Sequence, residues 1–112
     1  MNAKIPKSFN VLAHTVHIRL LSESALKAEA KLKKYKAAIN DEICGMYLHE
    51  NHTIYLSKSL TGTELEQTFL HEKMHCLLES CGKSNLSQNE GFVDLLSELL
   101  YQTIVTAKGN TR

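Results

Sequence analysis

Five consecutive residues, His71-Glu72-Lys73-Met74-His75, carry the clearest chemical pattern in the chain. Two histidines four positions apart on a helix project from the same side of it, offset by only about 40° around the axis. Their ring nitrogens can bind one zinc ion, and the glutamate after the first histidine then reaches a zinc-bound water rather than the zinc. The spacing predicts a water-activating hydrolase, with His71 and His75 as ligands and Glu72 as general base. The alternative is a surface helix with two solvated histidines.

A catalytic zinc site needs a third protein ligand beside an open position for water. The longer H-E-x-x-H-x-x-G-x-x-H pattern does not supply it, because Leu78 stands at its glycine position and Cys81 at its last histidine. Glu90, which opens the next predicted helix, is the best candidate for this ligand. Asp94 follows four residues later on the same face, where its carboxylate could hold a ligand imidazole in one orientation.

Glu90 also has a competing structural role. Residues 87–90, Ser-Gln-Asn-Glu, fit a capping box, in which the glutamate bonds back to the start of its own helix. The ligand role requires the Glu90 carboxylate and the two imidazoles to converge on one point, about 2.0–2.2 Å from each. The capping role requires Glu90 to turn towards Ser87 instead. Two weaker candidates for the third ligand are Glu79, close to the motif on the same helix, and Glu98, two turns further along.

The histidine pair needs a helix, and the flanking residues predict one over residues 61–80. Thr61 and Thr63, each with a glutamate three residues later, fit capping boxes at its start, and Gly82 is a natural stop. One apolar stripe of this helix should face the core, and the two histidines lie beside that stripe. The stripe consists of Leu70, Met74, Leu77 and Cys81.

Period-two patterns predict strands over residues 9–21, 42–48 and 53–57. The last two strands are joined by a polar turn at residues 49–52, which predicts a hairpin with one strand at a sheet edge. We interpret the other histidines as polar strand and turn residues rather than as ligands. They are His14, His17, His49 and His52.

Two further helices are predicted, over residues 22–39 and 87–107. The first is amphipathic and rich in lysine; such a helix can dock on acidic partners or membranes, but the dispersed lysines favour a solvated outer face. The second carries a broad apolar face. The predicted fold class is therefore α+β: a short antiparallel sheet with an edge hairpin, packed on about three helices.

The 112 residues suffice for one domain with a modest core, so residues 1–112 are predicted as a single domain, frayed over 1–8 and 108–112. The formal net charge of +1 gives no reason to expect nucleic-acid binding, and no apolar run approaches the about 20 residues of a transmembrane helix. The three cysteines form no C-x-x-C pair, and residues 1–9 lack the apolar stretch of a secretory signal. These features indicate reduced thiols in a cytoplasmic compartment.

Three segments, residues 54–57, 69–75 and 89–96, together resemble small zincins carried by phages and prophages. These are similar to minimal members of the ImmA/IrrE metallopeptidases, in the gluzincin group, and the likeness covers roughly residues 42–103. The resemblance implies a zincin-like fold in which an edge strand precedes the active-site helix. It also implies one Zn²⁺ per chain, bound by His71, His75 and Glu90, with Glu72 activating water. The E-E-x-A-N pattern of the larger members is absent.

The predicted function is that of a zinc-dependent metallopeptidase, which hydrolyses peptide bonds by Glu72-assisted attack of zinc-bound water. An extended peptide or protein substrate would pair with the edge strand and lie across the zinc. If the chain is phage- or prophage-encoded, the bacterial cytoplasm is its expected location. The rival interpretation is a non-catalytic module, zinc-stabilised or metal-free, that binds a phage or host protein. Substrate identity and oligomeric state stay open.

Overall fold

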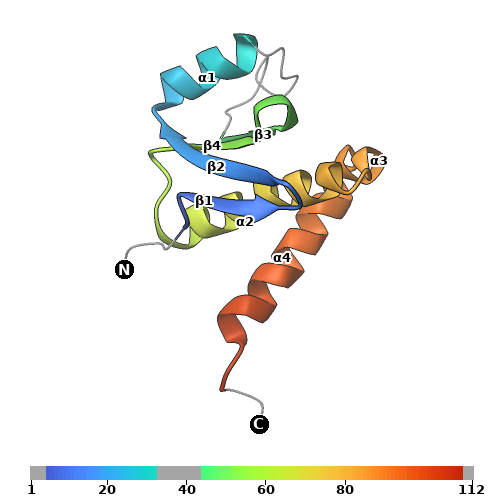
Figure 1. The fold of residues 1–112 in the computed structure, drawn as a ribbon. Coiled ribbons are helices and arrows are strands. Elements are labelled where there is room, and N and C mark those ends of the chain that lie inside the picture. The colour runs from blue at the N-terminus through green and yellow to red at the C-terminus, as the bar shows by residue number, and fades with distance from the viewer. Residues whose placement is uncertain (1–4, 33–43, 110–112) are drawn as a thin grey trace.

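The computed structural model of the protein describes residues 5–32 and 44–109, which form a mixed four-stranded sheet with helices on both faces (Figure 1). The predicted α+β class is therefore confirmed. Four α-helices and one 3-10 turn, η2, lie in this part of the chain. In chain order the elements are β1 Ser8–Val11, β2 His14–Leu21, α1 Glu23–Leu32, β3 Gly45–Leu48, η2 His49–Asn51, β4 Thr53–Ser57, α2 Gly62–Ser80, α3 Ser84–Ser87 and α4 Glu90–Thr106.

The sheet has the order β1-β2-β4-β3, and its central pair, β2 and β4, is parallel. The prediction of an antiparallel sheet is therefore wrong. The chain leaves the end of β2 through α1 and returns through β3 before β4 begins, and a long crossover that contains a helix allows parallel pairing. The outer pairs, β1 with β2 and β3 with β4, are both antiparallel.

The single strand predicted over residues 9–21 is in fact a hairpin. The chain reverses between β1 and β2, and Leu12 lies there with φ of 54°, a left-handed conformation that glycine or asparagine adopts more readily. No turn residue marks this reversal, so the alternation of apolar residues runs through it. The hairpin also reaches into the segment predicted to be frayed, because β1 starts at Ser8 and Ile18 donates its N–H to the Lys7 carbonyl.

The hairpin predicted before the motif helix is confirmed in β3 and β4. β4 has the predicted bounds, and β3 begins at Gly45; residues 42 and 43 of the predicted strand lie outside the described residues. The turn between them contains η2 and ends at His52, which has φ of 50°. β3 is an edge strand, since β4 is its neighbour on one side and no described strand pairs with the other.

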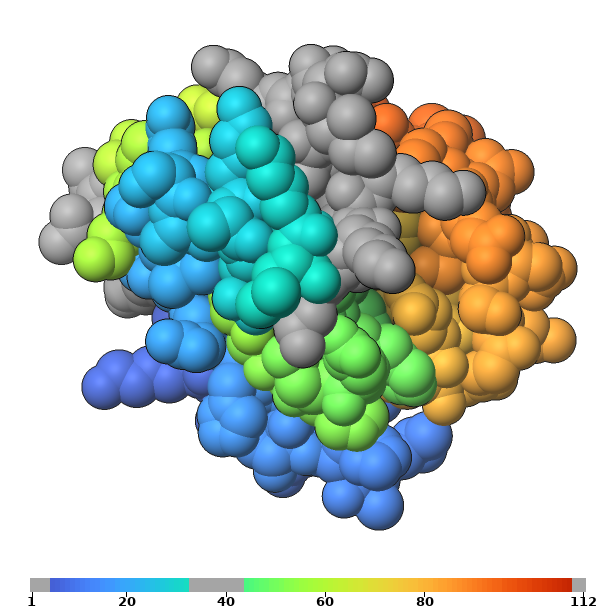
Figure 2. Space-filling model, turned by 90° about the horizontal axis from the view of Figure 1, so that it is seen from above, coloured from blue at the N-terminus to red at the C-terminus, as the bar shows by residue number. Residues whose placement is uncertain are grey.

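Helices cover both faces of the sheet, so β4 is buried along its whole length. On one face, Ile54 and Leu56 pack against Phe69 and Cys76 of α2. On the other face, α1 packs against Met46 and Tyr55. Figure 2 views the molecule from above, the side on which α1 lies. Consecutive β4 side chains point to opposite faces, which explains why the two clusters alternate along the strand. α2 is therefore fixed to the sheet by the larger of these two clusters.

α2 matches its predicted start and end closely, and α1 matches its predicted start. α2 ends at Ser80 and is followed by Gly82 in the left-handed region with φ of +80°, as expected for a helix stop. Its N-cap, Thr61, makes no side-chain capping bond, so the predicted capping boxes do not form. α1 is capped by Ser22, whose hydroxyl accepts the Ala25 N–H, and residues 33–39 of that predicted helix lie outside the described residues.

The final helix is less buried than its apolar pattern suggests. Val93 and Ser97 are its buried residues, whereas Leu95, Leu99 and Ile104 are at least half exposed. α4 packs on α2 and α3, and it runs downward beyond the rest of the fold in Figure 1. Among the described helices, none has both the length and the apolar content needed to cross a membrane.

Gly45, the first residue of β3, has no room for a side chain. A Cβ there would lie 2.9 Å from Leu56 Cδ2 and 3.1 Å from both Thr68 Cγ2 and the Tyr55 carbonyl oxygen. Gly45→Ala should therefore destabilise the protein by about 1–3 kcal/mol, measured by urea denaturation. The matched control is Gly91→Ala, where the nearest atom would lie at 3.6 Å within a helix, so a small gain in stability is expected. Equal effects of the two changes would contradict the prediction.

Candidate metal centre

Two helices bring the predicted ligands together. His71 and His75 lie one turn apart on α2, with ring centroids 5.0 Å apart, and Glu90 is the first residue of α4. One Glu90 carboxylate oxygen lies 2.9 Å from His75 Nε2, and the other lies 3.4 Å from His71 Nε2. The short helix α3 makes this possible, because it turns the chain between the end of α2 and the start of α4.

This group of side chains fits a metal ion. Its three ligand atoms all lie within 4.8 Å of one another. Two ligand atoms of a tetrahedral zinc, each about 2.0–2.2 Å from the ion, are separated by about 3.3–3.6 Å. The 3.4 Å contact of Glu90 with His71 falls in that range, and the 2.9 Å contact with His75 is somewhat shorter. Two imidazole nitrogens and one carboxylate oxygen also form the donor set of catalytic His₂Glu sites. His71, His75 and Glu90 can therefore hold a metal ion.

The capping alternative for Glu90 does not form. α4 is capped by Asn89, whose side-chain oxygen accepts the Phe92 N–H at 3.0 Å. Ser87, the other partner of the expected capping box, belongs to α3 and uses its hydroxyl elsewhere. The Glu90 carboxylate is therefore directed at the two imidazoles rather than at its own helix.

Glu72 is buried next to this group. Its side chain is 5% exposed, and its Oε1 has no hydrogen-bond partner among the described residues. Burial and, secondly, the charge of Glu90 raise the pKa of Glu72 to about 8, against a smaller lowering by a backbone hydrogen bond from Tyr47. A carboxyl group with a pKa shifted towards neutrality can both accept and donate a proton near pH 7, as a general acid–base catalyst must.

Asp94 lies where an orienting carboxylate is needed. Its Oδ1 is 2.9 Å from His71 Nδ1, while the other ring nitrogen of His71 faces Glu90. A hydrogen bond from Nδ1–H to Asp94 keeps the proton on that nitrogen and leaves Nε2 with its lone pair towards the site. Asp94 therefore orients the first of the two imidazoles.

The second imidazole is held by two residues for which the sequence predicts other roles. His75 Nδ1 lies 2.9 Å from the Ser87 hydroxyl, and that hydroxyl donates to Glu79 Oε2 at 3.0 Å. His75 itself is buried, and this burial lowers its pKa more than the neighbouring Glu90 raises it. By spacing alone, Ser87 fits a helix cap and Glu79 a weak third ligand. The four-residue helix that carries Ser87 has no sequence signal of its own, because residues 82–86 are typical of a loop.

A pocket adjoins the group of His71, His75 and Glu90. A pocket of about 200 Å³ lies between α2 and α4, and its lining includes His71 and Asp94. The edge strand β3 passes on the side of Glu72, since Tyr47 of that strand supplies the backbone hydrogen bond to its carboxylate. The candidate metal centre thus lies between the edge strand β3 and a pocket with a polar lining. The remaining lining residues are Gln67, Thr68, Ser97 and Glu98.

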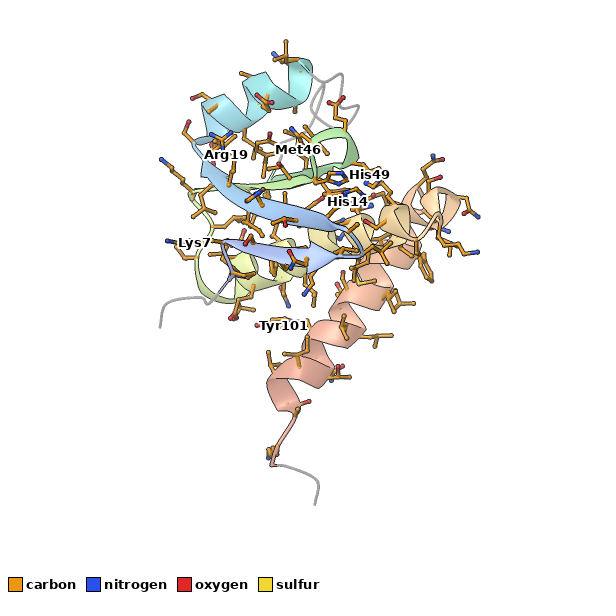
Figure 3. The ribbon with its side chains drawn as sticks, in the orientation of Figure 1. Lys7, His14, Arg19, Met46, His49 and Tyr101 are labelled. Carbon is orange, nitrogen blue, oxygen red and sulfur yellow. The ribbon has the colours of Figure 1, made fainter. Side chains whose placement is uncertain are left out.

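Three of the other histidines gather at one end of the sheet. The rings of His14 and His52 stack at 4.1 Å, and His49 lies edge-on to His52 at 5.3 Å; Figure 3 labels His14 and His49. The Tyr47 hydroxyl is 2.7 Å from His49 Nδ1. Among the described residues, this cluster does not form a metal-binding group, whereas His71, His75 and Glu90 do.

The cysteines divide between the core and the surface. Cys76 is fully buried between α2 and the sheet. Cys81 is exposed, so the prediction that it lies on the core stripe is wrong: α2 ends at Ser80, before the stripe reaches it.

No protein-family model, no curated protein and no solved structure matches the chain.

Proposed function

We propose that this protein is a zinc-dependent metallopeptidase that hydrolyses peptide bonds with Glu72 as general base. The observation that carries the proposal is the convergence of His71, His75 and Glu90 at distances suited to one ion. A buried carboxylate oxygen of Glu72 lies beside that group and has no hydrogen-bond partner in the described part of the chain, which supports a catalytic rather than a purely structural site. Two imidazoles with one carboxylate favour zinc over magnesium or calcium, which prefer sites built from oxygen ligands.

When bound, zinc supplies a Lewis acid that polarises a carbonyl oxygen and makes water more acidic. Glu72 accepts a proton from the attacking water through its unpaired Oε1. As the C–N bond breaks, Glu72 returns that proton to the leaving nitrogen, so that a carboxylic acid and an amine are formed. At neutral pH the acid then passes its proton to the amine, which leaves a carboxylate and an ammonium group. A cation near Glu90 offsets the negative charge that helps to raise the pKa of Glu72, and so brings this pKa closer to neutrality.

The edge strand β3 supports an extended peptide as the substrate. Ser57 donates its N–H to the Cys44 carbonyl, and the alternation of an antiparallel ladder then directs the backbone groups of Gly45 and Tyr47 away from β4. The Tyr47 N–H is used by Glu72, while a peptide strand could pair with the remaining groups and lie across the metal site. The resemblance to small phage-borne zincins supports a bacterial cytoplasmic location for this reaction.

Zinc binding by the purified chain tests the proposal directly. After EDTA treatment and dialysis, isothermal titration at pH 7 should give one zinc per chain, and the zinc-loaded protein should cleave an unstructured protein such as casein. Glu90→Gln should lower the zinc affinity by more than about a hundredfold, because a ligand rather than a supporting group is changed. Glu64→Gln, on the exposed side of the same helix α2, is the matched control.

Each outcome separates the two candidate functions. A wild-type chain that takes up no zinc at neutral pH contradicts the proposal and favours a metal-free interaction module. A chain that binds one zinc but cleaves no peptide favours a zinc-stabilised, non-catalytic module.

A further inference from the structure

We propose that Ser87 and Glu79 are positioning residues that hold His75 in place for the metal, in a chain of hydrogen bonds from His75 through Ser87 to Glu79. The inference rests on the proposed function, because it assigns a role to residues around the same site. Neither residue belongs to the group of His71, His75 and Glu90 whose ligand atoms converge.

The direction of the two hydrogen bonds fixes the proton on His75. A serine hydroxyl has one proton, and Ser87 donates it to Glu79 Oε2 at 3.0 Å. The Ser87 oxygen is then an acceptor, so the 2.9 Å contact with His75 Nδ1 is a bond donated by Nδ1–H. A neutral His75 therefore carries its proton on Nδ1 and presents the lone pair of Nε2, which is the atom facing Glu90.

Burial explains why a hydroxyl stands between the imidazole and the carboxylate. His75 and Ser87 are both buried, whereas Glu79 is only partly buried. A carboxylate placed directly against Nδ1 would have to lose most of its hydration, which is unfavourable for a charged group. Through Ser87, the charge of Glu79 reaches His75 while Glu79 keeps contact with solvent. The other ligand, His71, is less buried and is bonded directly by the exposed Asp94.

The same hydrogen bonds connect the helices that form the site. Glu79 lies four residues after His75 on α2, so both project from one face of that helix. Ser87 of α3 is bonded to both of them, and Glu90 follows three residues later at the start of α4. The chain of bonds therefore fixes the path that returns Glu90 to the histidines.

Zinc affinity in two variants of the full chain tests this role. Ser87→Ala and Glu79→Gln should each lower the zinc affinity about ten- to a hundredfold, measured by competition with a chromogenic chelator at pH 7. Glu79→Gln keeps the size of the side chain and removes only its charge. The controls are Ser84→Ala, an exposed serine of the same helix α3, and Glu64→Gln; both should stay within about twofold of wild type.

Two further measurements distinguish positioning from general stability. The visible absorption spectrum of the Co²⁺-loaded protein reports on the ligand geometry, and it should change in Ser87→Ala and Glu79→Gln but not in the controls. Urea unfolding of the metal-free forms should show that Glu79→Gln folds as stably as Glu64→Gln. If Ser87→Ala does not fold, Glu79→Gln alone decides the question.

The outcomes that overturn the proposal differ from those that overturn the function. Wild-type protein that binds no zinc overturns both. Wild-type protein that binds one zinc, with unchanged affinity and Co²⁺ spectrum in both variants, overturns the positioning role alone. The positioning role is also overturned if zinc affinity falls only in a variant whose metal-free form is less stable than wild type.

Discussion

Glu72→Gln protein is expected to bind one zinc ion per chain and to cleave peptides about 10²–10⁴-fold more slowly than wild type. Glutamine fills the same buried space but cannot accept a proton from water or return it to the leaving nitrogen. The carboxylate is not one of the three converging ligands, so metal binding should survive. Zinc content and the rate of casein cleavage, measured on the same preparation, check both halves of the prediction.

Glu64→Gln is the control for this experiment, because it removes a carboxylate from the exposed start of the same helix. It should retain wild-type activity. A zinc-loaded Glu72→Gln protein with more than a tenth of the wild-type rate would rule out Glu72 as the general base.

Metal-free protein is expected to become less stable as the pH rises from about 4.5 to about 8, because the pKa of Glu72 is about 8 in the native state and ordinarily 4.5. Between these values the native state binds more protons than the unfolded state, so the free energy of unfolding falls as pH rises. The contribution of Glu72 to stability is fully present below its unfolded-state pKa of 4.5 and is lost as the pH rises through its native-state pKa of about 8. Each tenfold difference in proton affinity is worth about 1.4 kcal/mol, and the two pKa values differ by about 3.5, so the loss should be on the order of 5 kcal/mol.

Urea denaturation with EDTA at pH 5 and pH 8, on wild type and Glu72→Gln, measures this effect. Glu72→Gln should be more stable than wild type at pH 8, and the advantage should shrink at pH 5. The comparison isolates Glu72, since His75, whose pKa is lowered, makes an opposite contribution that both proteins share. Parallel pH profiles for the two proteins would show that Glu72 is not held protonated in the metal-free fold.

Features encoded within a few residues could be predicted. α2 ends as expected because Gly82 adopts the left-handed conformation that stops a helix, and β4 has its predicted bounds because an apolar run ends at polar residues on both sides. The i,i+4 spacing placed the two histidines on one side of α2 for the same local reason. Glu90 and Asp94 could be singled out because they lie one turn apart at the start of a predicted helix.

Features that depend on distant partners could not be predicted. Nothing within β2 or β4 marks them as parallel neighbours, because their pairing follows from the crossover between them. The turn at Leu12 could not be predicted, because leucine is not a residue type that indicates a positive φ. Ser87 fits a capping box by spacing, but α3 places its hydroxyl between His75 and Glu79, and that choice is made by packing rather than by the local sequence.

The placement of the whole ligand set within residues 71–94 has a consequence for local unfolding. α4 is attached to the rest of the fold mainly through α2 and α3, and much of its apolar surface is exposed. It should therefore unfold locally more readily than the sheet. A metal shared by α2 and α4 closes a short segment of chain, for which the entropy loss is small. Such an ion would hold α4 against α2. The order of α4 would then depend on whether the metal is bound, whereas the sheet would stay folded in the metal-free protein.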